Sequence, residues 1–147
     1  MIRFEGSATV QRPLHEVFAY VADFTTLPQY DRYVESAEQT SPGPVGSGTM
    51  WTHRRVQGRR RFDAPIRMVD FEPDRRFVME SGSNGFAVRS TMTFEPAGEG
   101  ASRFREVLEM RLSGFTRLFE PIIARQVPKQ GAEVHRRLKE VLENRPA

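Results

Sequence analysis

The sequence contains no cysteine, which excludes disulfide bonds, thiolate metal sites and a cysteine nucleophile. Its three histidines, at positions 15, 53 and 135, lack metal-ligand spacing and clustered carboxylates, so we expect no metal site and no cofactor. No segment approaches the roughly 20 apolar residues of a transmembrane helix, and the charges near the start are unlike a secretory leader. These absences predict a cytoplasmic protein.

Two catalytic motifs are also missing. The chain has no Gly-x-Ser-x-Gly nucleophile elbow. Gly43, Gly46 and Gly48 precede a predicted strand, whereas a phosphate-binding loop follows a strand and opens a helix. Nucleotide binding is therefore rejected.

The length and the phenylalanine content suit one folded domain. A chain of 147 residues buries roughly 70% of its unfolded surface, and we expect a single domain over residues 1–147. Although only 38% of residues are hydrophobic, 11 phenylalanines supply large burial per residue. Lysine is scarce: 20 of the 22 cations are arginine.

The first third of the chain predicts a strand followed by two short helices. Apolar and polar residues alternate over 2–10, which indicates a half-buried strand. Pro13 then opens a helical spacing of apolar residues that ends near Asp23. A second helical turn is expected over 27–33, before a loop rich in proline and glycine.

The middle of the chain predicts an antiparallel meander. Strand-like segments are separated by tight turns, of which Gln57-Gly58 and the Gly-Ser-Asn-Gly link at 82–85 are the clearest. On the last strand, Glu106 shares a face with Phe104 and Leu108 and should point inward. The predicted strands cover 49–56, 59–71, 75–81, 86–95 and 104–112.

The C-terminal third predicts one long amphipathic helix from Leu118 to about Asn144. Pro121 can start its main segment. Pro128 removes a backbone donor and clashes with the carbonyl of Ala124, so we expect a kink there.

This order of elements resembles the helix-grip fold of the START-like (SRPBCC) superfamily, which includes birch-pollen-allergen-like proteins and the bacterial polyketide cyclase/dehydrase and lipid transport family. The similarity covers essentially the whole chain. It implies an α+β fold in which a curved antiparallel sheet of about seven strands wraps round the C-terminal helix, with two short helices after the first strand. It also implies a cavity between sheet and helix. The matching segments are 13–18, Asp23 with 27–30, 45–49, 71–73 and 138–143.

A curved sheet cannot touch a straight helix along its whole length, so large side chains or a ligand must fill the gap. An apolar gap with a few polar groups is the usual setting of a small-molecule site, and a fully packed core is the alternative. On the strand at 49–56 we expect Trp51 and His53 to face inward, because burying the indole brings the largest gain. The predicted lining residues are Thr49, Trp51, His53, Phe62, Met92, Phe94, Phe119 and Ile123, with Tyr30 and Tyr33 at the mouth.

Two charged features have structural interpretations. Burial would raise the pKa of Glu106 unless a cation pairs with it, and with so many arginines we expect an Arg–Glu pair there, as also for Glu80. The run from Arg54 to Arg61 concentrates five cations at one hairpin tip and could bind phosphate, anionic lipid or RNA. It matches no nucleic-acid reader, so we favour a solvated tip and expect no nucleic-acid partner.

The leading hypothesis is the binding of a small hydrophobic ligand, which the resemblance suggests is polyketide, lipid or isoprenoid-like. The alternative is an aromatase/cyclase or dehydratase-type enzyme that uses His53 or Tyr30 for proton transfer. A second alternative is a protein-interaction or co-chaperone module acting through the 54–61 tip. A homodimer stays open in each case.

Overall fold

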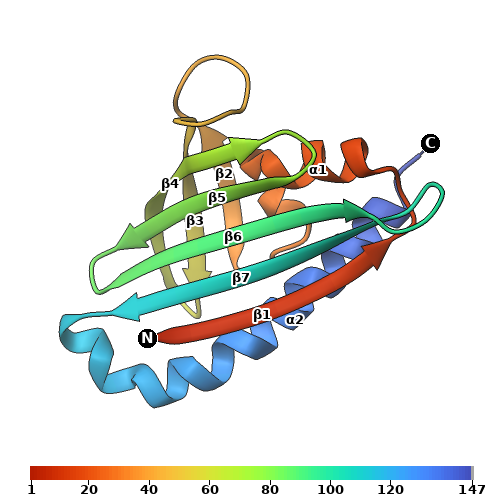
Figure 1. Ribbon diagram of the computed structural model, residues 1–147. Coiled ribbons are helices and arrows are strands. Elements are labelled where there is room, and N and C mark those ends of the chain that lie inside the picture. Colours follow the sequence, from red (N-terminus) through yellow and green to blue (C-terminus); the bar gives the residue numbers. More distant parts are fainter. Residues whose placement is uncertain (147) are drawn as a thin grey trace.

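Seven antiparallel strands form one curved sheet in the computed structural model, which describes residues 1–146 (Figure 1). The order β1-β7-β6-β5-β4-β3-β2 pairs the first strand with the last, and the other strands follow as a meander. The predicted helix-grip fold is confirmed. The strands are β1 (Ile2–Val10), β2 (Val34–Gln39), β3 (Met50–Gln57), β4 (Arg60–Glu72), β5 (Arg76–Ser83), β6 (Phe86–Pro96) and β7 (Ser102–Leu112).

Strand β2 was not predicted from the sequence. It lies at the edge of the sheet, paired only with β3, and of its residues only Val34 is buried. An edge strand with one buried apolar residue lacks the alternation of apolar and polar residues that would indicate a strand.

Two short helices follow β1, as expected. Helix α1 (Leu14–Ala22) starts directly after Pro13. The second is the 3₁₀ helix η1 (Phe24–Gln29), which begins earlier than the predicted turn because the Asp23 side chain accepts a hydrogen bond from the Thr25 amide at 3.1 Å. Both helices cover the same end of the sheet (Figure 1).

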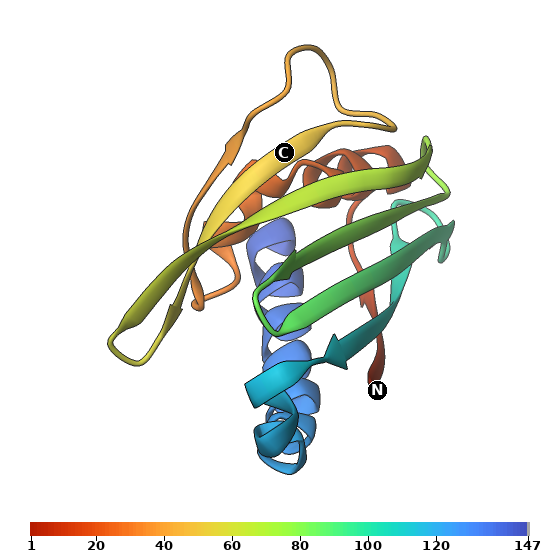
Figure 2. The same ribbon diagram turned by 90° about the vertical axis from the view of Figure 1, so that its left-hand side faces the viewer.

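The C-terminal helix α2 (Glu120–Glu143) follows the 3₁₀ helix η2 (Gly114–Phe119) and passes across the concave face of the sheet (Figure 2). Pro121 occupies its first turn and Pro128 lies inside it. Its last turn is firmly tied to the start of the chain. Arg12 Nη2 donates to the carbonyl oxygens of Glu143 and Arg145 at 2.7 and 2.8 Å, and the Glu143 carboxylate accepts from the Gln11 amide.

The first half of α2 is held much more loosely. No residue from 120 to 126 is buried, whereas His135, Leu138 and Leu142 in the second half are. Where α2 crosses β1, a Cβ placed on Gly131 would lie 2.5 Å from the Phe4 ring. Glycine therefore sets how closely helix and sheet approach.

Gly131→Ala is expected to destabilise the fold by about 1–3 kcal/mol, because overpacking Phe4 outweighs the roughly 1 kcal/mol that alanine gains over glycine inside a helix. Urea unfolding measures the change. Gly46→Ala is the control, since no atom lies within 4 Å of the added methyl group, and adding Phe4→Leu should rescue Gly131→Ala. A Gly131→Ala protein as stable as the wild type would contradict this account.

Candidate ligand-binding site

Aromatic rings pack one half of the space between the sheet and its helices. Phe24 meets Trp51 edge-on with ring centroids 4.9 Å apart, and Phe18 meets Phe94 at 5.0 Å. Trp51 is fully buried, and His53 beside it is 4% exposed, so the predicted facing of β3 is confirmed. This half, beneath α1 and η1, is filled by the protein's own side chains.

The other half is more open. Its buried centre consists of Ile2, Phe4, Leu112 and Val127, under the first half of α2. Around that centre the walls are only half-buried, and nearer the end of the sheet Phe62 and Phe86 meet edge-on with centroids 5.9 Å apart. The half-buried walls are Phe86, Leu108, Met110 and Ile123.

His53 brings a polar atom without a partner to the concave face. Ser81 Oγ donates to the Pro65 carbonyl at 2.7 Å, so toward His53 Nε2, 3.4 Å away, it can only accept. That arrangement places the imidazole proton on Nε2 and leaves Nδ1 as an acceptor. Nδ1 is buried and has no hydrogen-bond partner among residues 1–146.

Trp51 supplies the complementary group. Its Nε1–H, a donor only, is also buried without a partner within the described part of the chain. Residues two apart on a strand share a face, so Trp51 and His53 present one free donor and one free acceptor to the same side of β3. Buried polar atoms are nearly always satisfied, and two unsatisfied ones on one face point to a binding group.

The ionisation of His53 suits this role. Burial, and then the nearby Arg55 cation, lower the pKa of His53 from 6.5 to about 4, so the ring is neutral at pH 7. Arg55 itself lies 3.9 Å from the carboxylate of Asp31, whose pKa is raised by burial.

The prediction that an arginine pairs with Glu106 is wrong. Glu106 Oε1 accepts from His135 Nε2 on α2 at 2.7 Å, and Oε2 accepts from Ser90 Oγ at 2.5 Å. The arginines of β7 alternate with Glu106 and so point to the outer face, which leaves a helix residue as the inward partner. The Arg–Glu pairing expected for Glu80 is confirmed, by Arg67 at 3.0 Å and Arg89 at 2.9 Å.

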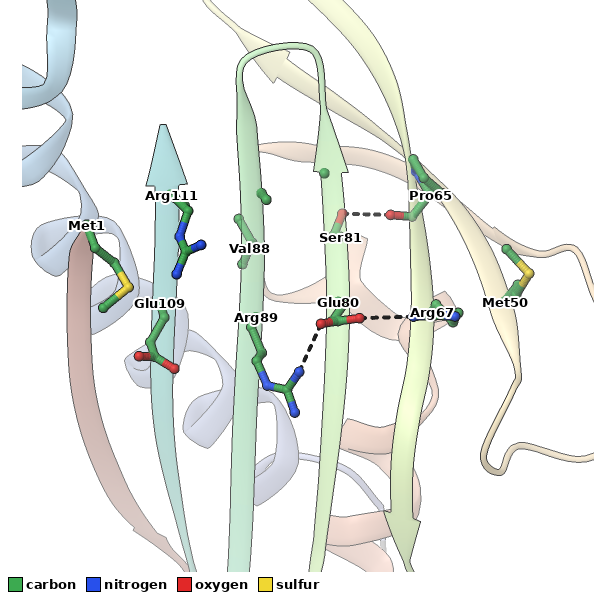
Figure 3. A pocket seen from close by; sticks show the side chains of 12 residues that line it. Met1, Met50, Pro65, Arg67, Glu80, Ser81, Val88, Arg89, Glu109 and Arg111 are labelled. Carbon is green, nitrogen blue, oxygen red and sulfur yellow. Dashed lines mark hydrogen bonds and ion pairs between the residues drawn. The ribbon is translucent and has the colours of Figure 1, made fainter. Parts of the chain in front are cut away.

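Two hollows lie on the outer face of the sheet. The larger, about 650 Å³, lies beside Gly82 and Ala87 (Figure 3). A ladder of alternating charges runs through it, because the strand register sets Arg67 opposite Glu80, then Arg89, then Glu109. The second hollow, about 530 Å³, lies on β1, β6 and β7 and is lined mainly by polar and charged residues. Neither coincides with the space between sheet and α2.

A sequence profile of the polyketide cyclase / dehydrase and lipid transport family matches residues 1–143. The chain belongs to this family. The resemblance read from the sequence is thereby confirmed. A search of curated proteins found no match.

Solved structures share the fold of this family member at low sequence identity. A START superfamily protein from Mycobacterium smegmatis is 10% identical with a TM-score of 0.80, covering 96% of this chain and 97% of its own. The Zhui aromatase/cyclase from Streptomyces sp. R1128 is 13% identical with a TM-score of 0.78, over 97% and 94% of the two chains. The di-domain aromatase/cyclase BexL is 17% identical with a TM-score of 0.74, and the match covers 95% of this chain but 46% of BexL.

The residues predicted to line a cavity between the sheet and the C-terminal helix fall into two groups. Tyr30, Met92 and Phe94 are buried in the packed aromatic half, and the Thr49 hydroxyl is engaged by the Gly46 amide at 2.9 Å. Tyr33 is half-buried and accepts a hydrogen bond from Arg32. Phe62 and Ile123 are half-buried beside the open half, and His53 is buried on β3. Trp51 belongs to the packed aromatic half, and Phe119 is 54% exposed.

Three polar groups of the concave face were not predicted from the sequence: Ser81, Ser90 and His135. His135 carried a usable signal, because it precedes the buried Leu138 and Leu142 by three and seven residues and so shares their stripe on α2. Ser81 and Ser90 had only strand alternation to mark them.

Two further expectations concern metals and charge. No group of three potential metal ligands occurs within residues 1–146, and no helix there is long and apolar enough to cross a membrane. At the hairpin tip, Arg54 pairs with Asp63 at 2.9 Å and Arg61 with Glu35 at 3.2 Å.

His53 should make stability depend on pH. Between pH 6.5 and 4 the unfolded chain binds a proton that the folded ring does not, so the free energy of unfolding falls as the pH falls, by up to about 1.4 kcal/mol per unit. Urea unfolding across this range should therefore show a shallower slope for His53→Gln than for the wild type. An NMR titration midpoint near 6.5 for His53 would refute the assignment.

Proposed function

We propose that this chain binds a small hydrophobic molecule of polyketide, lipid or isoprenoid type between the concave face of the sheet and the first half of α2. The observation that carries the proposal is the pair of unpartnered nitrogens, Trp51 Nε1 and His53 Nδ1, facing the interior from β3. Apolar burial would supply the affinity, and the two nitrogens would orient a polar group such as a hydroxyl.

The two halves of the interior have different roles in this proposal. The packed aromatic half, including Tyr30, Met92 and Phe94, holds the shape of the sheet. Phe62 and Ile123 would contact the ligand, because both side chains are only half-buried by the protein itself. The loosely held first half of α2 can adjust to the bulk of the ligand, since none of its first seven residues is buried.

Two adjacent isoleucines test the location. Ile123 is half-buried against the open half, and Ile122 is 56% exposed. With the uncharged fluorescent probe Nile red, Ile123→Asn should weaken binding about tenfold or more, because the polar amide replaces an apolar wall. Ile122→Asn should change affinity by no more than about twofold. Thermal unfolding verifies that both variants fold, and equal losses for the two would place the probe elsewhere.

Catalysis is the second candidate function, and the free Nδ1 of His53 favours it. A neutral imidazole with an unengaged lone pair can accept a proton from a poly-β-ketone chain held against it, as in an aromatase/cyclase or dehydratase. The bound conformation of the chain would supply much of the rate.

With a poly-β-ketone thioester as substrate, His53→Ala should lower turnover about 100-fold or more while leaving Nile red binding nearly intact. His15→Ala is the matched control at an exposed position. Normal turnover by His53→Ala would remove His53 as the base and leave the binding function standing.

A further inference from the structure

Four large apolar side chains stand exposed on one stripe of η2 and the first turn of α2. Phe115 is 85% exposed, Leu118 74%, Phe119 54% and Ile122 56%. Their spacing of three, four and seven residues places them on one helical face, the pattern that normally packs against a core. No described residue covers this stripe, which we call the apolar stripe.

The segment that carries the apolar stripe is held in place. The Ser113 amide donates to the Gly85 carbonyl at 3.0 Å, and the Thr116 hydroxyl donates to the same carbonyl from the first turn of η2. Ser113 and Thr116 also cap each other reciprocally. The exposure of the stripe is therefore fixed by hydrogen bonds to the β5–β6 turn.

The charges on the segment that carries the apolar stripe are almost all positive. Between residues 111 and 130, Glu120 is the one acidic residue among four cations. Elsewhere on this protein most arginines lie within 4 Å of a carboxylate, but these four have no such partner among residues 1–146. The exposed, unpaired cations are Arg111, Arg117, Arg125 and Lys129.

Two more unpaired cations lie toward the same end of the molecule. Arg59 and Arg60, at the β3–β4 turn, are exposed and have no carboxylate partner within the described chain. Both views place this turn and η2 in the lower part of the molecule (Figures 1 and 2). The two unpaired groups of cations thus share one end of the fold.

We propose that this end docks on an anionic lipid bilayer, with Phe115, Leu118, Phe119 and Ile122 inserted at the interface and the unpaired cations on the headgroups. Protruding apolar side chains flanked by cations are what interfacial binding requires. A second copy of the chain fits less well, because a two-fold contact would set one ring of unpaired cations against another. This inference rests on the apolar stripe and its charges and does not depend on the proposed ligand site.

Sedimentation with vesicles tests the proposal. The wild-type chain should bind phosphatidylcholine vesicles containing about one third phosphatidylserine, and bind phosphatidylcholine alone at least about tenfold more weakly. Arg117→Gln with Arg125→Gln should weaken anionic binding about 25-fold, at roughly fivefold for each cation. The matched control is Arg75→Gln with Arg136→Gln, two exposed arginines outside this end, with an expected change below about threefold.

The apolar contribution has its own variants. Phe115→Ser with Leu118→Ser should weaken vesicle binding at least about tenfold and leave the unfolding temperature unchanged, since both side chains are exposed. Met50→Ser with Val69→Ser, at exposed positions of the sheet, should have no effect on binding.

Three outcomes would overturn the proposal. They are no binding to anionic vesicles, binding that neither the arginine pair nor the Phe115–Leu118 pair of substitutions weakens, or a solution dimer that Phe115→Ser dissociates. The isoleucine pair separates this proposal from the ligand site. Ile122→Asn should lose vesicle binding and keep Nile red, whereas Ile123→Asn should do the reverse.

Discussion

A strongly curved sheet and a long helix can pack closely along only part of their lengths, and the other features of this molecule follow from where the two separate. Close packing occurs over the second half of α2, where Leu138 and Leu142 are buried and Arg12 ties the last carbonyls to the start of the chain. Toward η2, Val127 is the last residue of α2 that is buried against the sheet, and none of residues 120–126 is buried. The fold is thus anchored at one end and open at the other.

The interior follows the same division. Under α1 and η1, aromatic rings fill the volume, and their burial stabilises this half of the fold. Between that cluster and the open end lie the polar groups. Glu106, His135 and Ser90 satisfy one another and join α2 to the sheet, whereas Trp51 and His53 each bury a nitrogen without a partner. An unsatisfied buried polar atom costs about 1–3 kcal/mol, a cost that a bound ligand can recover.

Most of the fold could be predicted from the sequence because its signals are local. Alternation marked β1, β6 and β7, glycine-containing turns marked the hairpins, and Pro121 marked the start of α2. The inward facing of Trp51 and of Glu106 followed from the same alternation. Strand β2 was missed because it is a polar edge strand. The partner of Glu106 was missed because it depends on how α2 crosses β7, which no local pattern encodes. The division of the predicted lining residues between the two halves was missed for the same reason.

The ladder of charges on the outer face has a consequence for how the sheet assembles. In the native register, charges of opposite sign face each other across five neighbouring strands. The residues, in order across the sheet, are Arg67, Glu80, Arg89, Glu109 and Arg3. A strand that slipped by two residues would keep its apolar face inward but would lose these pairings. The ladder therefore favours the native register over a shifted one while the chain folds. Hydrophobic burial alone does not distinguish the two registers, because both keep the apolar face inward.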